Sequence, residues 1–179
     1  SVEFELVYVF QKLMRTKKSV ITFLDGNQQL NQYQTADFAT SLAGDFDLTR
    51  ILPDQLIENA SKINILIIAD PQVPFTEKEK FAIDQYIMQG GKVIWMIDPV
   101  MVSIDSLSGG FQTYAFPRDL NLNDQLFRYG VRLNYELLQD VECARIQVNT
   151  ALAGSPPQYT VHPWYYSPLL VPSDEHPAT

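Results

Sequence analysis

The sequence has 179 residues and carries 13 Lys plus Arg against 21 Asp plus Glu, a formal net charge of −8. With 46% hydrophobic and 19% charged residues, it predicts a globular chain with a full core. Because an acidic chain lacks the clustered cations that phosphate backbones require, we expect no nucleic-acid partner. Its apolar runs are far shorter than the roughly 20 residues of a spanning helix, so we expect no membrane span in this stretch.

Apolar segments of two kinds alternate over the first hundred residues. Runs rich in β-branched residues predict strands over residues 19–24, 46–52, 63–69 and 92–97. Apolar positions three to four apart predict helices over residues 4–14, 35–44, 53–60 and 76–89. We expect Thr35 to cap the second helix, and Thr76 with Glu79 to form a capping box at the last.

The strand over residues 63–69 is apolar on both faces, which is typical of a parallel sheet covered by helices on both sides. Parallel strands also need crossover helices, and the alternating pattern supplies them. The sequence therefore predicts an α/β fold with a doubly wound, mostly parallel sheet and helices on both faces, either flavodoxin-like or amidotransferase-like.

The pattern loosens after residue 98. We expect a loop over residues 103–118, a helix over 121–129 with Leu122, Leu126 and Phe127 as apolar positions, and a strand over 141–148 at the edge of the sheet. Six prolines between residues 155 and 177 exclude a regular helix or a central strand. We therefore expect an α/β domain over 1–150 and an extended tail over 151–179 that packs on it or leads to a following domain.

Asp25, Asp70 and Asp98 each follow a predicted strand, and doubly wound folds bind ligands at the carboxyl ends of their strands. A hard cation such as magnesium is one candidate ligand. Aspartate before proline or glycine is, however, ordinary turn chemistry, and we favour that interpretation and expect no metal. The predicted ligand-binding positions of this rim are Asp25, Asn27, Asp98 and Pro99.

We identify no catalytic residues. Cys143 does not lie on a glycine-flanked elbow, and it cannot form an internal disulfide because it is the only cysteine. His162 and His176 lie in the proline-rich tail without a recognisable catalytic partner. The Gly90-Gly91 pair follows a helix instead of preceding one, so it does not form a phosphate-binding loop. These features predict a protein that is not an enzyme and has no cofactor.

The aromatic cluster Trp164, Tyr165 and Tyr166 is suited to stacking on a sugar ring or anchoring a protein partner. The alternative is that these side chains pin an extended segment to its own domain.

Four collinear stretches resemble the GldG family, the gliding-motility-associated ABC transporter auxiliary proteins of the Bacteroidota. They read FTEKEKFAIDQYIMQGGKVIWMIDPV from residue 75, SIDSL from 103, LNLNDQLFRYGVRLN from 120 and HPWYYSPLL from 162. Family members often carry Gly, His or Asn, and then Gly-Glu-Leu after the first strand. Here that stretch reads Gly-Asn-Gln-Gln-Leu from residue 26, which departs from the pattern by one glycine and one carboxylate.

This resemblance implies a soluble piece of a membrane-anchored protein, on the periplasmic side of the inner membrane, beside an ABC permease and ATPase. The implied function is a non-enzymatic binding or scaffolding domain of a gliding-associated ABC transporter complex. Whether the chain also forms a homo-oligomer is left open by the sequence. The domain is also similar to one in an intraflagellar-transport protein for which carbohydrate binding has been suggested. The alternative function is therefore a carbohydrate-binding module for periplasmic or cell-surface glycan.

Overall fold

The structure is a computed structural model that describes residues 3, 6, 7, 9, 10, 17–102, 114–152 and 154–170. The chain divides into two compact units, Ser1–Tyr135 and Glu136–Thr179. Within the described ranges, no helix has both the length and the apolar character that a membrane span requires. Most of the predicted opening helix, most of the predicted loop over residues 103–118 and the tail from residue 171, with His176, fall outside these ranges.

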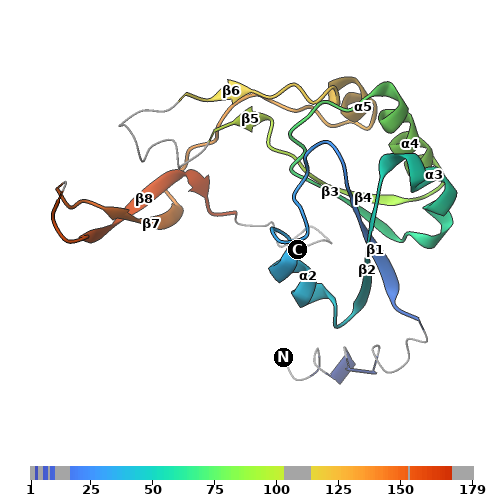
Figure 1. Ribbon diagram of the computed structural model, residues 1–179, viewed down its shortest axis with the longest axis horizontal. Coiled ribbons are helices and arrows are strands. Elements are labelled where there is room, and N and C mark those ends of the chain that lie inside the picture. Colours follow the sequence, from blue (N-terminus) through green and yellow to red (C-terminus); the bar gives the residue numbers. More distant parts are fainter. Residues whose placement is uncertain are drawn as a thin grey trace. The chain divides into compact units, whose positions relative to one another are not determined.

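The first unit is built on a four-stranded sheet (Figure 1). Its strands are β1 (Ser19–Leu24), β2 (Phe46–Ile51), β3 (Ile65–Ala69) and β4 (Lys92–Met96). All three strand pairs are parallel, and the order across the sheet is β2-β1-β3-β4. This order matches the first four strands of a flavodoxin-like sheet, and it confirms the predicted doubly wound α/β class.

Helices connect the strands and cover the two faces. They are α2 (Ala36–Leu42), α3 (Leu56–Asn59) between the 3₁₀ turns η1 (Pro53–Gln55) and η2 (Ala60–Lys62), α4 (Glu77–Met88) and α5 (Asn123–Arg128). In β3, Leu66 and Ile68 pack into the larger core with residues of α3, α4 and α5. Ile67 and Ala69 pack into the smaller core, where α2 contributes Leu42. Both faces of β3 are therefore buried, as its apolar sequence predicted.

Two predicted helix starts have different outcomes. At α4 the capping box is present, because Thr76 Oγ1 accepts from the Glu79 N–H and Glu79 accepts from the Thr76 N–H. Thr35 occupies the N-cap position of α2, but its side chain makes no capping hydrogen bond and donates to the Asn31 carbonyl instead. The predicted role of Thr35 as a side-chain cap is therefore wrong.

The helix predicted over 121–129 is shorter in the structure. Asn121 has a left-handed backbone with φ of 56°, so α5 begins at Asn123. Leu122 and Leu126 are buried, whereas Phe127 is 72% exposed. Within the predicted loop over 103–118, residues 116 and 117 form β6 (Phe116–Pro117), which pairs antiparallel with β5 (Val100–Met101).

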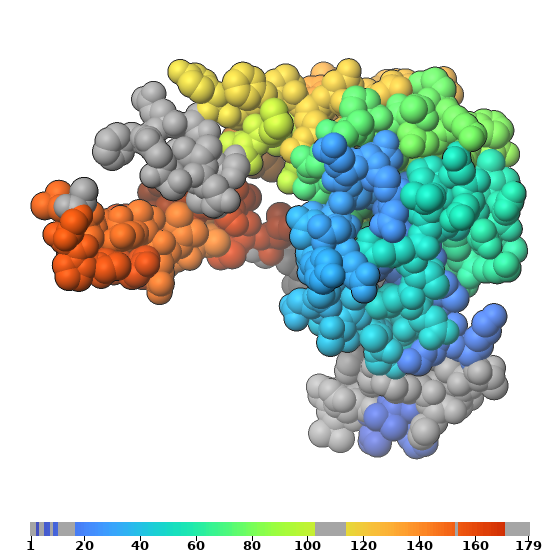
Figure 2. All heavy atoms as spheres, in the orientation of Figure 1, coloured from blue at the N-terminus to red at the C-terminus, as the bar shows by residue number. Residues whose placement is uncertain are grey.

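The second unit is a two-stranded antiparallel sheet of β7 (Cys143–Asn149) and β8 (Tyr159–Pro168). The strand predicted over 141–148 was therefore misplaced, because β7 pairs with β8 and not with the edge of the main sheet. Both strands of a two-stranded sheet are edge strands. Prolines are tolerated in edge strands, which is why β8 can contain Pro163 and Pro168. None of the described residues after 135 is buried, and Figure 2 shows the segment of β7 and β8 in orange and red. The predicted domain boundary at residue 150 stays a prediction.

Candidate functional site

The sheet order identifies where a ligand would be expected. The chain leaves β1 toward β2 on one side and later returns to β3 on the other, so the direction of winding changes between β1 and β3. In doubly wound folds, ligands bind beyond the carboxyl ends of the strands at this position. Asp25 directly follows β1 and Asp70 directly follows β3, so both lie at this rim.

The loop after β1 occupies this position itself. Residues 26–28 have φ values of 109°, 49° and 51°, three successive left-handed conformations that turn the chain back over the sheet. The Leu30 N–H then donates to the Ala69 carbonyl at 3.0 Å, and Gln29 Oε1 accepts from the Ala69 N–H at 3.0 Å. The loop is therefore bonded across the end of β3.

Asp25 is held by an arginine from the neighbouring strand. Arg50 of β2 donates from Nη1 to Asp25 Oδ1 at 2.6 Å and to the Leu30 carbonyl at 3.3 Å. Its second nitrogen bonds to Thr35 Oγ1, and the guanidinium lies 4.9 Å from the centre of the Phe23 ring. One arginine thus joins β1, β2, the loop and the start of α2.

A second arginine binds the other side of the rim. Arg118 Nη1 donates to Asp70 Oδ1 at 2.9 Å and to the Asp98 carbonyl at 3.4 Å, and the Arg118 N–H donates to the Pro99 carbonyl at 2.8 Å. The structure therefore brings Asp70, Asp98 and Pro99 together around Arg118. All three aspartates lie within the residues that the structure describes. Among these residues, neither a hydrogen bond nor an ion pair joins Asp25 to Asp70 or to Asp98.

Asn27 connects the loop to α4 and keeps one polar atom unpaired. Its Nδ2 donates to the Pro74 carbonyl at 3.3 Å and to Glu79 Oε2 at 3.4 Å. Its Oδ1 is buried without a hydrogen-bond partner, and so is Nε2 of Gln29. The loop therefore contains one unused acceptor and one unused donor, which a water molecule or a small polar group can satisfy.

The remaining candidate reactive groups lie elsewhere. Cys143 is the half-buried first residue of β7, and His162 Nε2 forms a hydrogen bond with Thr160 Oγ1 at 2.9 Å. Across the described part of the chain, no group of three or more His, Cys, Asp or Glu side chains is placed to hold a metal ion.

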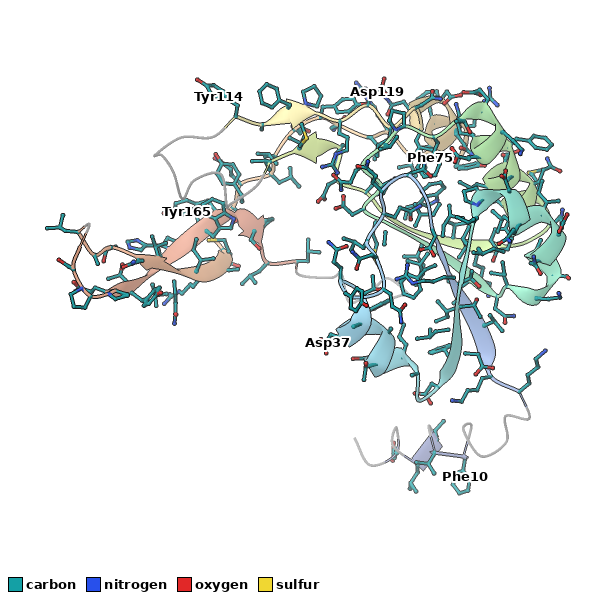
Figure 3. All side chains as sticks on the ribbon, viewed as in Figure 1. Phe10, Asp37, Phe75, Tyr114, Asp119 and Tyr165 are labelled. Atoms are coloured by element: carbon teal, nitrogen blue, oxygen red, sulfur yellow. The ribbon has the colours of Figure 1, made fainter. Side chains whose placement is uncertain are left out.

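The predicted aromatic cluster lies on an irregular part of β8. The register of the β7–β8 pair shifts between two paired positions, Cys143 with Pro168 and Arg145 with Pro163. Between these positions β8 has three more residues than β7, so β8 bulges. Trp164 and Tyr166 lie in this bulge with ring centres 5.6 Å apart. Tyr165, labelled in Figure 3, is 49% exposed and Tyr166 is 45% exposed. A bulge re-aims side chains, and this one presents aromatic surface to solvent.

Sequence reasoning missed the residues that complete the rim, namely Arg50, Arg118 and Gln29. The one available signal was Arg50, a charge within an otherwise mostly uncharged strand segment. Arg118 lies 48 residues from Asp70 in the chain, and nothing local connects the two.

Comparisons with known proteins complete the description. No curated protein matches the chain significantly. A solved structure of the mmIFT52 N-terminal domain is similar at 17% sequence identity with a TM-score of 0.49, and the match covers 82% of this chain and 66% of that chain. The profile of the ABC transporter auxiliary family, described as an ABC-type uncharacterized transport system, matches residues 18–179. The chain belongs to this family.

Proposed function

We propose that this chain is a non-enzymatic binding and scaffolding domain of a gliding-motility-associated ABC transporter complex. The observation that carries the proposal is the family match over residues 18–179, which makes the chain an auxiliary component of an ABC-type transport system. The proposed location is the periplasmic side of the inner membrane, in a membrane-anchored protein. The proposed partners are the permease and ATPase subunits.

The chemistry of the rim supports a role in binding rather than catalysis. Asp25 and Asp70 are each bound by an arginine, which occupies an oxygen atom that a general acid or base would need. Asn27 has a free acceptor atom and the Asp98 side chain is exposed. Within the proposed function, the rim with Asp25, Asn27, Asp98 and Pro99 contacts a ligand or partner through polar groups.

The test is a deletion of this domain from the full-length protein, with its membrane anchors retained. We expect gliding to stop, because the scaffold surfaces are gone, while the remaining subunits keep their normal abundance. The matched control restores the wild-type domain in the same strain. Gliding that continues after the deletion, with the complex still assembled, would refute the proposal.

A second candidate is a carbohydrate-binding module, favoured by one observation. The tilted ring pair of Trp164 and Tyr166 and the half-exposed Tyr165 provide the apolar ring faces on which sugars stack. Calorimetric titration against a broad glycan panel tests this candidate. Binding that is lost in Trp164→Ala would support it, and a flat titration for every glycan would exclude it.

A further inference from the structure

Among the described residues, strand β4 pairs only with β3 and is therefore an edge of the main sheet (Figure 1). The Met96 carbonyl accepts from the Asp70 N–H at 2.8 Å, so the Met96 backbone faces β3. Because successive residues alternate in direction, the N–H and C=O groups of Val93, Trp95 and Ile97 face away from the sheet. Throughout the described ranges, no backbone hydrogen bond joins these groups to another segment.

The sequence of β4 is unusual for an edge strand. Edge strands commonly carry charges, prolines or bulges that discourage pairing, whereas residues 93–97 are continuously apolar. On one face, Val93, Trp95 and Ile97 line an apolar groove of about 450 Å³ together with Leu126 and Leu133.

On the other face of β4, Ile94 and Met96 are each 42% exposed. Both faces of the strand therefore present apolar surface beside an unpaired backbone, which is the arrangement that strand addition buries.

We propose that a second copy of this chain pairs with this edge, β4 against β4 in antiparallel orientation, about a two-fold axis at Trp95. This register places Val93 opposite Ile97 and Ile94 opposite Met96. Outward-facing residues then lie opposite outward-facing residues, which is the condition for hydrogen-bonded pairs between antiparallel strands. Apolar side chains meet apolar side chains on both faces, and the contact is self-complementary, as a two-fold interface requires.

The charged residues Lys92 and Asp98 favour this register over its neighbours. With the axis at Trp95, Lys92 of each copy lies opposite Asp98 of the other, so two opposite-charge pairs form. Both residues are exposed, and within the described part of the chain neither side chain has an ion-pair partner. Moving the axis to Ile94 would place Lys92 opposite Met96 and Asp98 opposite Gly90. Moving it to Met96 would place Asp98 opposite Ile94. Neither alternative pairs the charges.

The pairing joins two four-stranded sheets into one of eight strands. The two-fold axis is perpendicular to the sheet, so the grooves beside the two Trp95 side chains lie on the same face. The inference is independent of the proposed transporter role.

The test is light scattering on the 179-residue chain after size-exclusion chromatography. We expect wild type to have twice the 20.4 kDa mass of one chain. Lys92→Glu and Asp98→Lys each place like charges opposite one another twice, so each should weaken the dimer by about tenfold or more. The double variant Lys92→Glu/Asp98→Lys restores opposite pairs and should regain the dimer. The matched control is Lys62→Glu, an exposed lysine on η2 away from β4, which should stay dimeric.

Amide hydrogen exchange of the wild type provides a second measurement that does not depend on any variant folding. We expect the amides of Val93, Trp95 and Ile97 to be protected at high concentration and to lose protection on dilution. A monomeric wild type at every concentration, single variants that stay dimeric, or a double variant that stays monomeric would overturn the proposal. So would protection that is independent of concentration, because the chain would then cover its own edge.

Discussion

Arg50 illustrates how a single side chain organises the rim. It bonds Asp25, the Leu30 carbonyl and Thr35, and it lies over the Phe23 ring, while its side chain is only 22% exposed. A planar guanidinium reaches several acceptors at once, whereas an ammonium is a point charge.

We therefore predict that Arg50→Lys keeps the charge but lowers the free energy of unfolding by about 1–3 kcal/mol. The measurement is urea denaturation at pH 7, with Lys62→Arg as the control at an exposed site. A variant as stable as wild type would show that charge alone, and not the fork of hydrogen bonds, is what Arg50 supplies.

Gly91 is required for a different reason from its neighbour. Gly90 ends α4 with φ of 88°, but a Cβ on Gly91 would lie 2.4 Å from the ring of Tyr86, a side chain that is 1% exposed. We predict that Gly91→Ala lowers the free energy of unfolding by about 2–3 kcal/mol through overpacking, more than the loss expected for a substitution with open space around it.

Gly130→Ala is the matched comparison for Gly91→Ala, because Gly130 is left-handed with open space around its Cβ position and should lose about 1 kcal/mol. Thermal denaturation of both variants measures and compares their losses of stability. Equal losses would contradict the steric argument.

Residue-level prediction succeeded where the interaction is local in the chain. The capping box of Thr76 and Glu79 depends on a spacing of three residues, and the structure contains it. Thr35 has the same chemistry, but Arg50 uses its hydroxyl, so the expected cap does not form. The partner that changes the outcome lies 15 residues away, where spacing gives no information.

At the scale of elements, α4 and α5 are joined by a buried lysine. Lys80 Nζ donates to both oxygens of Asp124 at 2.8 and 2.9 Å and to Glu77 at 3.0 Å. Burial alone would lower the pKa of Lys80, but the hydrogen bonds to Asp124 and Glu77 outweigh it and the pKa is raised. The hydrogen bond from Lys80 is the largest cause of the lowered pKa of Asp124.

This contact gives stability a defined pH dependence. Because the pKa of Asp124 is lower in the folded chain, its contribution is present above the unfolded pKa of about 4 and is lost as pH falls through the folded pKa. We predict that Asp124→Asn lowers the urea midpoint at pH 7 and that its difference from wild type shrinks toward pH 3.

Asp54→Asn is the control for the α4–α5 contact, since Asp54 pairs with Lys78 on an exposed surface and should contribute little. A difference between Asp124→Asn and wild type that is equal at pH 7 and pH 3 would contradict the assignment.

Elements were easier to predict than their partners. The strands over 19–24 and 92–97 follow from apolar, β-branched runs, and the structure places β1 and β4 there within one residue. The predicted strand over 141–148 also exists as β7, but its partner is β8, since pairing depends on contacts between distant segments. The strand order likewise required the structure, because parallel strands carry no local mark of their neighbours.

At the scale of the whole molecule, both hydrophobic cores consist of residues before 136, and the described residues after 135 add none to either. Phe75 is typical, at 1% exposure in the larger core (Figure 3). An isolated two-stranded sheet contributes little stability by itself. We therefore predict that a chain shortened to residues 1–135 folds with a urea midpoint close to that of the full chain. A shortened chain that is unfolded or binds a hydrophobic dye would show that residues 136–179 complete the core.

The fold class could be predicted from alternating apolar patterns, but the function could not be predicted from chemistry in the same way. The rim contains Asp25 and Asp70, which were expected, and the arginines that bind them, which were not. Family membership therefore carries the functional account, and the scaffold role is its central claim.

Co-purification tests that claim most directly. The 179-residue chain is mixed with the detergent-solubilised permease and ATPase pair and applied to a size-exclusion column, with an unrelated membrane transporter as the control. The account predicts that the chain elutes with the permease and ATPase and separately from the control. A chain that elutes alone in both mixtures would contradict it.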